Sequence, residues 1–101
     1  MTDKDVRPNE RLGRIAFRAW RRGFREADLV LGPFADRVGP TLSDEELTQF
    51  EALLAQDDDH ELYGWIIGSR PTPAEHETPL MARIRAFMNA HVAAAVADGA
   101  G

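Results

Sequence analysis

The sequence has no cysteine among its 101 residues, so disulfide bridges and thiolate metal sites are excluded. It also has no apolar run near the ~18 residues that a membrane-spanning helix needs. Its first residues are polar and lack the apolar segment of a secretory signal. Alternating strand patterns and a glycine-rich phosphate loop are missing as well. We therefore expect an all-α, cytoplasmic protein without membrane insertion.

Positive charge is confined to one part of the chain. Residues 1–40 carry a net charge of +3 and residues 41–101 carry −8, which gives −5 overall. Nucleic-acid binding usually requires net positive charge to displace counterions, and a local basic patch on an acidic body fits a protein partner better. A nucleic-acid binder that uses the basic part is the less favoured alternative.

Apolar residues at helical spacing divide the chain into five helices of one small domain. A chain of 101 residues is long enough for one domain. Residues 1–8 are expected to form a flexible arm, residues 9–38 the helices that carry the main motif, and residues 42–97 the supporting helices. Asn9 is a candidate cap for the first of these helices, and the alanine-rich C-terminal end is expected to fray.

Capping residues and prolines mark the helix boundaries. The expected capping boxes are formed by Ser43 with Glu46 and by Asp58 with Glu61, and the expected glycine C-caps are Gly23 and Gly68. Gly32-Pro33 is expected to kink or break the second helix. The last helix could begin at Thr72 or at Thr78. Thr78 is preferred, because the other start would leave Pro79 in the helix interior at a cost of about 3 kcal/mol.

The first helix carries two stripes, one apolar and one basic. The apolar stripe ends at Trp20, which is expected to lie in the core. The basic stripe consists of Arg11, Arg14, Arg18, Arg21 and Arg22. The helix offers these arginines few carboxylates one turn away, so they should repel one another and remain unpaired. Unpaired positive charge on one face indicates an anionic partner.

Residues that could build an active site or a metal site are sparse. His60, His76 and His91 lack the spacing of metal ligands, and His91 lies on the apolar stripe of the last helix. The acidic run Asp57–Asp59 lacks the spacing of a calcium loop, and it is better explained as a helix start. We therefore expect no catalytic residue, no metal site and no enzymatic activity.

One motif goes beyond a generic helical domain. Arg22, Gly23 and Glu26 form an Arg-Gly-x-x-Glu pattern, which Arg21 and Asp28 flank. Further along, Leu-Leu-Ala-Gln-Asp-Asp is followed by Leu62 and Trp65. In this order and spacing, over roughly residues 10–90, the chain resembles the SdhE family of FAD assembly factors for succinate dehydrogenase.

The resemblance implies a five-helix protein that binds the flavoprotein subunit of succinate dehydrogenase, with the fumarate reductase flavoprotein as a second candidate. Such a protein promotes covalent attachment of FAD to a histidine of that subunit. The short helices of this chain offer no obvious dinucleotide cradle, so we do not expect it to hold FAD tightly itself. The implied partner-binding residues are Arg21, Arg22, Gly23, Glu26 and Asp28. The arginine is expected to pair with an acidic or carbonyl group of the partner and the glutamate with a cation. The alternative is a helical adaptor with no role in flavin chemistry.

Overall fold

The computed structural model describes the backbone of residues 8–100 and the side chains of residues 10–91, and all regular structure in that range is helical. The elements are α1 (Pro8–Trp20), α2 (Arg25–Arg37), η1 (Gly39–Thr41), α3 (Asp44–Leu54), α4 (Asp59–Ile67), η2 (Ala74–His76) and α5 (Pro79–Ala100). The expected all-α fold with five α-helices is therefore confirmed. No helix in the described range is long and apolar enough to cross a membrane.

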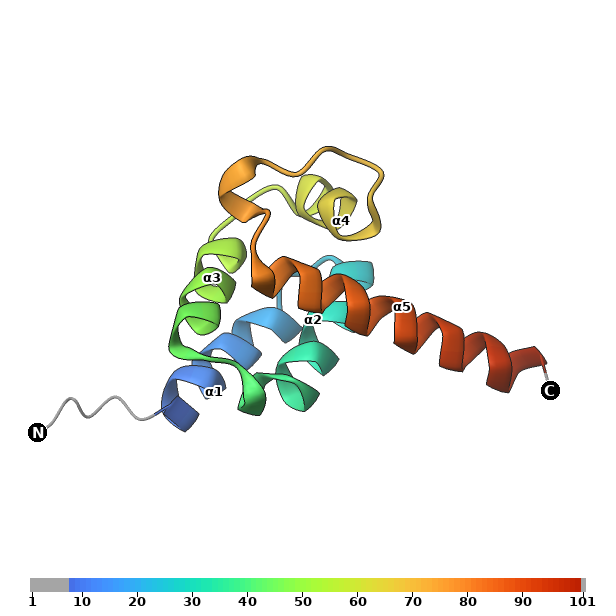
Figure 1. The fold of residues 1–101 in the computed structure, drawn as a ribbon, viewed down its shortest axis with the longest axis horizontal. Helices are drawn as coiled ribbons and strands as arrows, with labels where there is room; N and C mark the ends of the chain where they lie inside the picture. The colour runs from blue at the N-terminus through green and yellow to red at the C-terminus, as the bar shows by residue number, and fades with distance from the viewer. Residues whose placement is uncertain (1–7, 101) are drawn as a thin grey trace, which may run out of the picture.

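The helices enclose a single core. α1 packs on α2 and α3, and the first half of α5 contacts α2, α3 and α4, while its second half projects away from the other helices (Figure 1). The centre of the core is aromatic, because the ring of Phe34 meets Phe50 at 5.5 Å and Phe87 at 5.6 Å in edge-to-face geometry. This core fixes the end of α1 relative to α3 and α4.

Several predicted helix boundaries are confirmed. The Ser43 hydroxyl accepts from the backbone N–H of Glu46, and the Glu46 carboxylate accepts from the N–H of Ser43. α5 begins at Pro79, with the Thr78 hydroxyl accepting from the backbone at the third helical residue. Gly68 ends α4 in the left-handed conformation with φ of +82°.

The second predicted capping box forms only in part. The Asp58 carboxylate accepts from the backbone N–H of Glu61, as expected. The Glu61 carboxylate accepts instead from the indole N–H of Trp65, at 3.0 Å, and from Arg70, at 2.7 Å. Glu61 therefore connects α4 to the segment that follows it.

Pro33 does not break the second helix, so of the two predicted outcomes, a kink or a break, the break is wrong. α2 continues through this position to Arg37. Packing on both sides of the proline holds the helix together. A Cβ added to Gly32 would lie 2.3 Å from the ring of Trp20, so the indole rests directly on the α2 backbone. Phe34 is fully buried on the other side. This tertiary packing outweighs the missing proline N–H.

Three further expectations about the helices are corrected. α1 begins at Pro8, before the expected cap at Asn9, because proline is tolerated in a first helical turn. α5 remains helical to Ala100 rather than fraying. Trp20 is 39% exposed, and its indole N–H donates to Asp36 at the surface. His91 is exposed, but its ring stacks on that of Phe87 at 5.9 Å, as its place on the predicted stripe implies. Residues 1–7 of the expected arm lie outside the described residues.

Candidate functional site

The Arg-Gly-x-x-Glu motif forms the turn between α1 and α2. We refer to residues 21–26, which make up this turn and the first two residues of α2, as the tip. Gly23 has φ of +87°, a left-handed conformation that glycine adopts without a Cβ clash. A Cβ added there would meet no atom within 4 Å, so the space around Gly23 is open. The chain turns here because of backbone conformation, and the expected left-handed glycine is confirmed.

Asp28 and Phe24 hold the tip in place. The Asp28 carboxylate accepts from the backbone N–H of Arg22 at 3.1 Å, and its own N–H donates to the Phe24 carbonyl at 2.9 Å. The half-buried ring of Phe24 meets His60 at 4.6 Å and Tyr63 at 5.7 Å, both in α4. Asp28 thus fixes the path of the turn, and Phe24 anchors it on a neighbouring helix.

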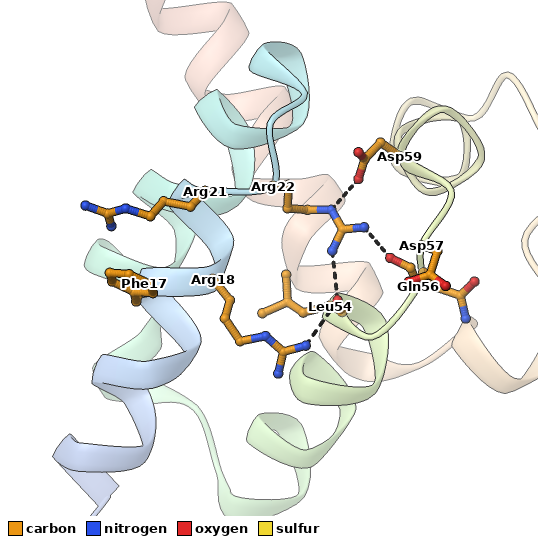
Figure 2. Close-up of a pocket in the computed structure, with 8 residues that line it drawn as sticks. All are labelled: Phe17, Arg18, Arg21, Arg22, Leu54, Gln56, Asp57 and Asp59. Carbon is orange, nitrogen blue, oxygen red and sulfur yellow. Dashed lines mark hydrogen bonds and ion pairs between the residues drawn. The ribbon is translucent and has the colours of Figure 1, made fainter.

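Arg22 points into the molecule. Figure 2 shows its guanidinium reaching across to the segment that joins α3 and α4. Nε donates to Asp59 Oδ1 at 2.6 Å, Nη1 donates to the Leu54 carbonyl at 2.8 Å, and Nη2 donates to the Gln56 carbonyl. The side chain is only 8% exposed. The carbonyl of Leu54 is among the last four of α3, which have no partner within the helix, so the cation caps that helix end.

The neighbouring side chains of the motif face solvent. Arg21 points away from the α3–α4 segment, and its guanidinium lies 4.1 Å from the centre of the exposed Phe17 ring (Figure 2). Gly23 and Glu26 are exposed. No hydrogen bond or ion pair joins Arg22 to Glu26, although sequence alone left that pairing open. The motif thus presents a bare backbone position and a carboxylate outward, over a buried arginine.

The expectation of an unpaired arginine stripe is wrong for two of its members. Arg22 is paired with Asp59, and Arg11 binds both oxygens of Glu51, at 2.8 and 3.0 Å. Glu51 lies in α3 and Asp59 in α4, 40 and 37 residues along the chain from the arginines that they bind, so the sequence gives no local sign of these pairs. The Arg11 guanidinium holds the pKa of the Glu51 carboxyl below its ordinary value through this hydrogen bond.

A cavity of about 330 Å³ opens beside the tip. It is lined by Phe17, Arg18, Arg21, Arg22, Leu54, Gln56, Asp57 and Asp59. Six of these residues were absent from the sequence-predicted site: Phe17, Arg18, Leu54, Gln56, Asp57 and Asp59. The acidic run Asp57–Asp59 is visible in the sequence, but there it indicates only a helix start and not a partner for Arg22. Backbone carbonyl acceptors such as that of Leu54 leave no signal in a sequence.

The histidines contribute to packing and the surface. His76 is buried, stacks on Trp65 at 5.2 Å, and its Nε2 lies 3.1 Å from the Gln56 side-chain nitrogen. His60 and His91 are exposed. Within the described part of the chain, no group of three or more histidine or acidic side chains is placed to hold a metal ion.

These features define a small helical domain that presents a solvent-exposed turn, held in place by the contacts of Arg22, Phe24 and Asp28. Comparison with known proteins identifies the family. A family model described as "Flavinator of succinate dehydrogenase" (Sdh5) matches residues 13–88, which include the whole tip. The chain belongs to the Sdh5 family.

Individual relatives agree with this assignment. The chain is 39% identical over 71 residues to the FAD assembly factor SdhE of Acetobacter pasteurianus, a match that covers 70% of this chain and 64% of that protein. It is 34% identical over 80 residues to the mitochondrial succinate dehydrogenase assembly factor 2 of Drosophila grimshawi, covering 74% and 54%. The mitochondrial assembly factor 2-A of Drosophila yakuba is 35% identical over 81 residues, covering 75% and 50%. The chain thus spans less than two thirds of the length of each of these relatives.

Proposed function

We propose that this chain is an assembly factor that binds the flavoprotein subunit of succinate dehydrogenase and promotes covalent attachment of FAD to it. The fumarate reductase flavoprotein is a second candidate partner, and the cytoplasm is the proposed location. The observation that carries the proposal is that the family match includes the tip, where Gly23 and Glu26 are exposed on a fixed scaffold.

In this proposal the motif residues divide into two groups. Glu26 pairs with a cation of the partner, Gly23 lets the partner's backbone approach closely, and Arg21 adds a positive charge beside them. Arg22 and Asp28 act as positioning residues. The direct pairing of Arg22 with a partner group, expected from the sequence, is replaced here by an indirect role, because its three donor atoms are already bonded within the chain.

The proposed role is not catalytic. The covalent bond forms between the flavin and a histidine of the partner, and a protein's usual contribution to cofactor chemistry is orientation and electrostatics. Binding of the tip selects a flavoprotein conformation in which the flavin and the histidine meet productively. FAD is the cofactor of the partner and is not held tightly by this chain. Glu26 and Asp28 in the first turn of α2 support this, because a pyrophosphate at that helix end would meet two carboxylates.

Covalent flavin on the partner tests the proposal. The flavoprotein subunit is produced with the wild-type chain, without it, and with Glu26→Gln, and its in-gel flavin fluorescence is compared. We expect fluorescence to depend on the chain and to fall severalfold with Glu26→Gln. Glu45→Gln is the matched control, because it neutralises another exposed acid in a first helical turn away from the tip.

Full fluorescence without the chain would overturn the proposal. Full fluorescence with Glu26→Gln, in a sample where the chain is required, would remove Glu26 from the proposed contact.

A further inference from the structure

Among the glycines of residues 10–91, where side chains are described, Gly13 is the one that the fold itself does not explain. Gly23 and Gly68 have positive φ, and a Cβ on Gly32, Gly39 or Gly64 would collide with a neighbouring side chain. Gly13 has neither property: a Cβ there would meet nothing within 4 Å. It lies in the middle of α1, where glycine destabilises a helix relative to alanine. A glycine that helix stability disfavours and internal packing does not need suggests close approach by something outside the chain.

The surface around Gly13 is shaped for contact. Phe17 follows one turn later and is 59% exposed, the largest exposed fraction among the large apolar side chains described. Residues three and four positions apart are neighbours on a helix, so Gly13, Arg14 and Arg21 surround the Phe17 ring. A shallow groove of about 610 Å³ runs along this face, lined by Glu10, Gly13, Arg14, Phe17 and Arg18.

The arginines on this face have little internal compensation. Arg14 makes no hydrogen bond or ion pair with any residue that the structure describes, but Glu51 attracts it electrostatically and Glu10 lies one turn before it on α1. Arg18 has one long hydrogen bond, 3.4 Å to the Leu54 carbonyl, and Arg21 lies over the Phe17 ring. Arg11 and Arg22, on the side of α1 that faces α3 and α4, are both paired with carboxylates. The arginines of α1 that have no paired carboxylate therefore lie near the glycine and the exposed ring.

We propose that the outer face of α1 around Gly13, Arg14 and Phe17, continued by Arg21 at the start of the tip, is a second docking surface that receives an acidic helix of the partner flavoprotein. This inference rests on the proposed function. The bare backbone at Gly13 lets that helix lie close to α1, Phe17 packs against an apolar residue of it, and the arginines meet its carboxylates. A duplex nucleic acid would be repelled by the net charge of −5. A membrane surface would have no need of the missing side chain at Gly13.

The experiment measures the affinity of the purified flavoprotein subunit for the full chain and its variants. Gly13→Gln fills the groove with a good helix former, so the variant should be at least as heat-stable as the wild type. We expect it nevertheless to bind at least tenfold more weakly. Ala52→Gln is the matched control, since it adds the same side chain at an exposed position inside α3, and it should bind like the wild type. Arg14→Glu should also bind at least tenfold more weakly, with a smaller dependence of affinity on salt.

A photoreactive phenylalanine analogue at position 17 then identifies the occupant. The proposal expects a crosslink to an acidic helical segment of the flavoprotein. It is overturned by a crosslink to a second copy of the chain or to a basic segment, or by wild-type affinity of Gly13→Gln. If Glu26→Gln weakens binding while Gly13→Gln does not, the second surface fails and the proposed function stands. If the wild-type chain does not bind the flavoprotein at all, the proposed function fails first.

Discussion

The buried guanidinium of Arg22 gives the sharpest test of the site's architecture. Arg22→Met keeps most of the side-chain volume but leaves the Asp59 carboxylate and the carbonyls of Leu54 and Gln56 without their donor. Hydrogen bonds to charged groups contribute about 1.5–3 kcal/mol each, and breaking a buried ion pair costs about 3–5 kcal/mol. The side chain of Asp59 is 25% exposed, so water recovers part of this loss. We expect a destabilisation of about 3 kcal/mol.

Thermal unfolding followed by circular dichroism measures this cost. In a domain of this size, 1 kcal/mol corresponds to roughly 4–8 °C in Tm, so Tm should fall by about 12–24 °C. Arg21→Met is the matched control, because it makes the same substitution at the adjacent position, where the guanidinium lies on an exposed ring. An exposed cation–π contact is worth about 0.5–1 kcal/mol. If Arg22→Met and Arg21→Met lower Tm equally, the reasoning that Arg22 is a structural anchor is refuted.

Two further predictions concern backbone strain and acid stability. Gly23→Ala should lower the free energy of unfolding by about 1–2 kcal/mol in urea titration, because alanine is strained at a φ of +87°. No steric clash adds to this cost, since the new Cβ meets no atom within 4 Å. An unchanged urea midpoint would show that the left-handed turn is not required. The pKa values of Glu46 and Glu51 are lowered in the folded state, chiefly by the hydrogen bonds from the Ser43 backbone and from Arg11. The stabilisation of the folded state by these two carboxylates is therefore fully present at a pH above their ordinary pKa of 4.5, and it is lost as the pH falls through and below that value. In Glu51→Gln, the free energy of unfolding should fall less steeply as the pH is lowered. If it depends on pH in the same way as in the wild type, the stabilising role given to the Glu51 carboxylate is contradicted.

Local signals in the sequence were sufficient to predict the helices. The capping box at Ser43 and Glu46 and the start of α5 at Pro79 depend on residues within one turn of each other, and both were predicted correctly. The break considered at Pro33 does not occur, because contacts from elsewhere in the chain, notably the indole of Trp20 against Gly32, hold α2 together. Packing between segments that are distant in sequence leaves no periodic signal.

The same distinction applies to the site. The left-handed Gly23 could be predicted from its place after a helical stripe. The inward direction of Arg22 could not, because its acceptors lie 32 to 37 residues further along the chain and two of them are main-chain carbonyls. The basic stripe is visible in the sequence, but only the folded chain shows that Arg11 and Arg22 form ion pairs with carboxylates while Arg14 forms none.

The bridge from Arg22 to Asp59 affects how sequence variants in this protein should be interpreted. Asp59 lies 36 positions after Gly23 and would be counted as a remote scaffold residue by any scheme that ranks positions by closeness in sequence to the motif. Loss of the Asp59 carboxylate releases the Arg22 guanidinium that secures the turn. Variants at Asp59 should therefore show the same defect as variants at the turn itself. A survey that groups variants by their distance in sequence from the motif would place Asp59 and the turn in different classes, although variants at both would act through the same contact.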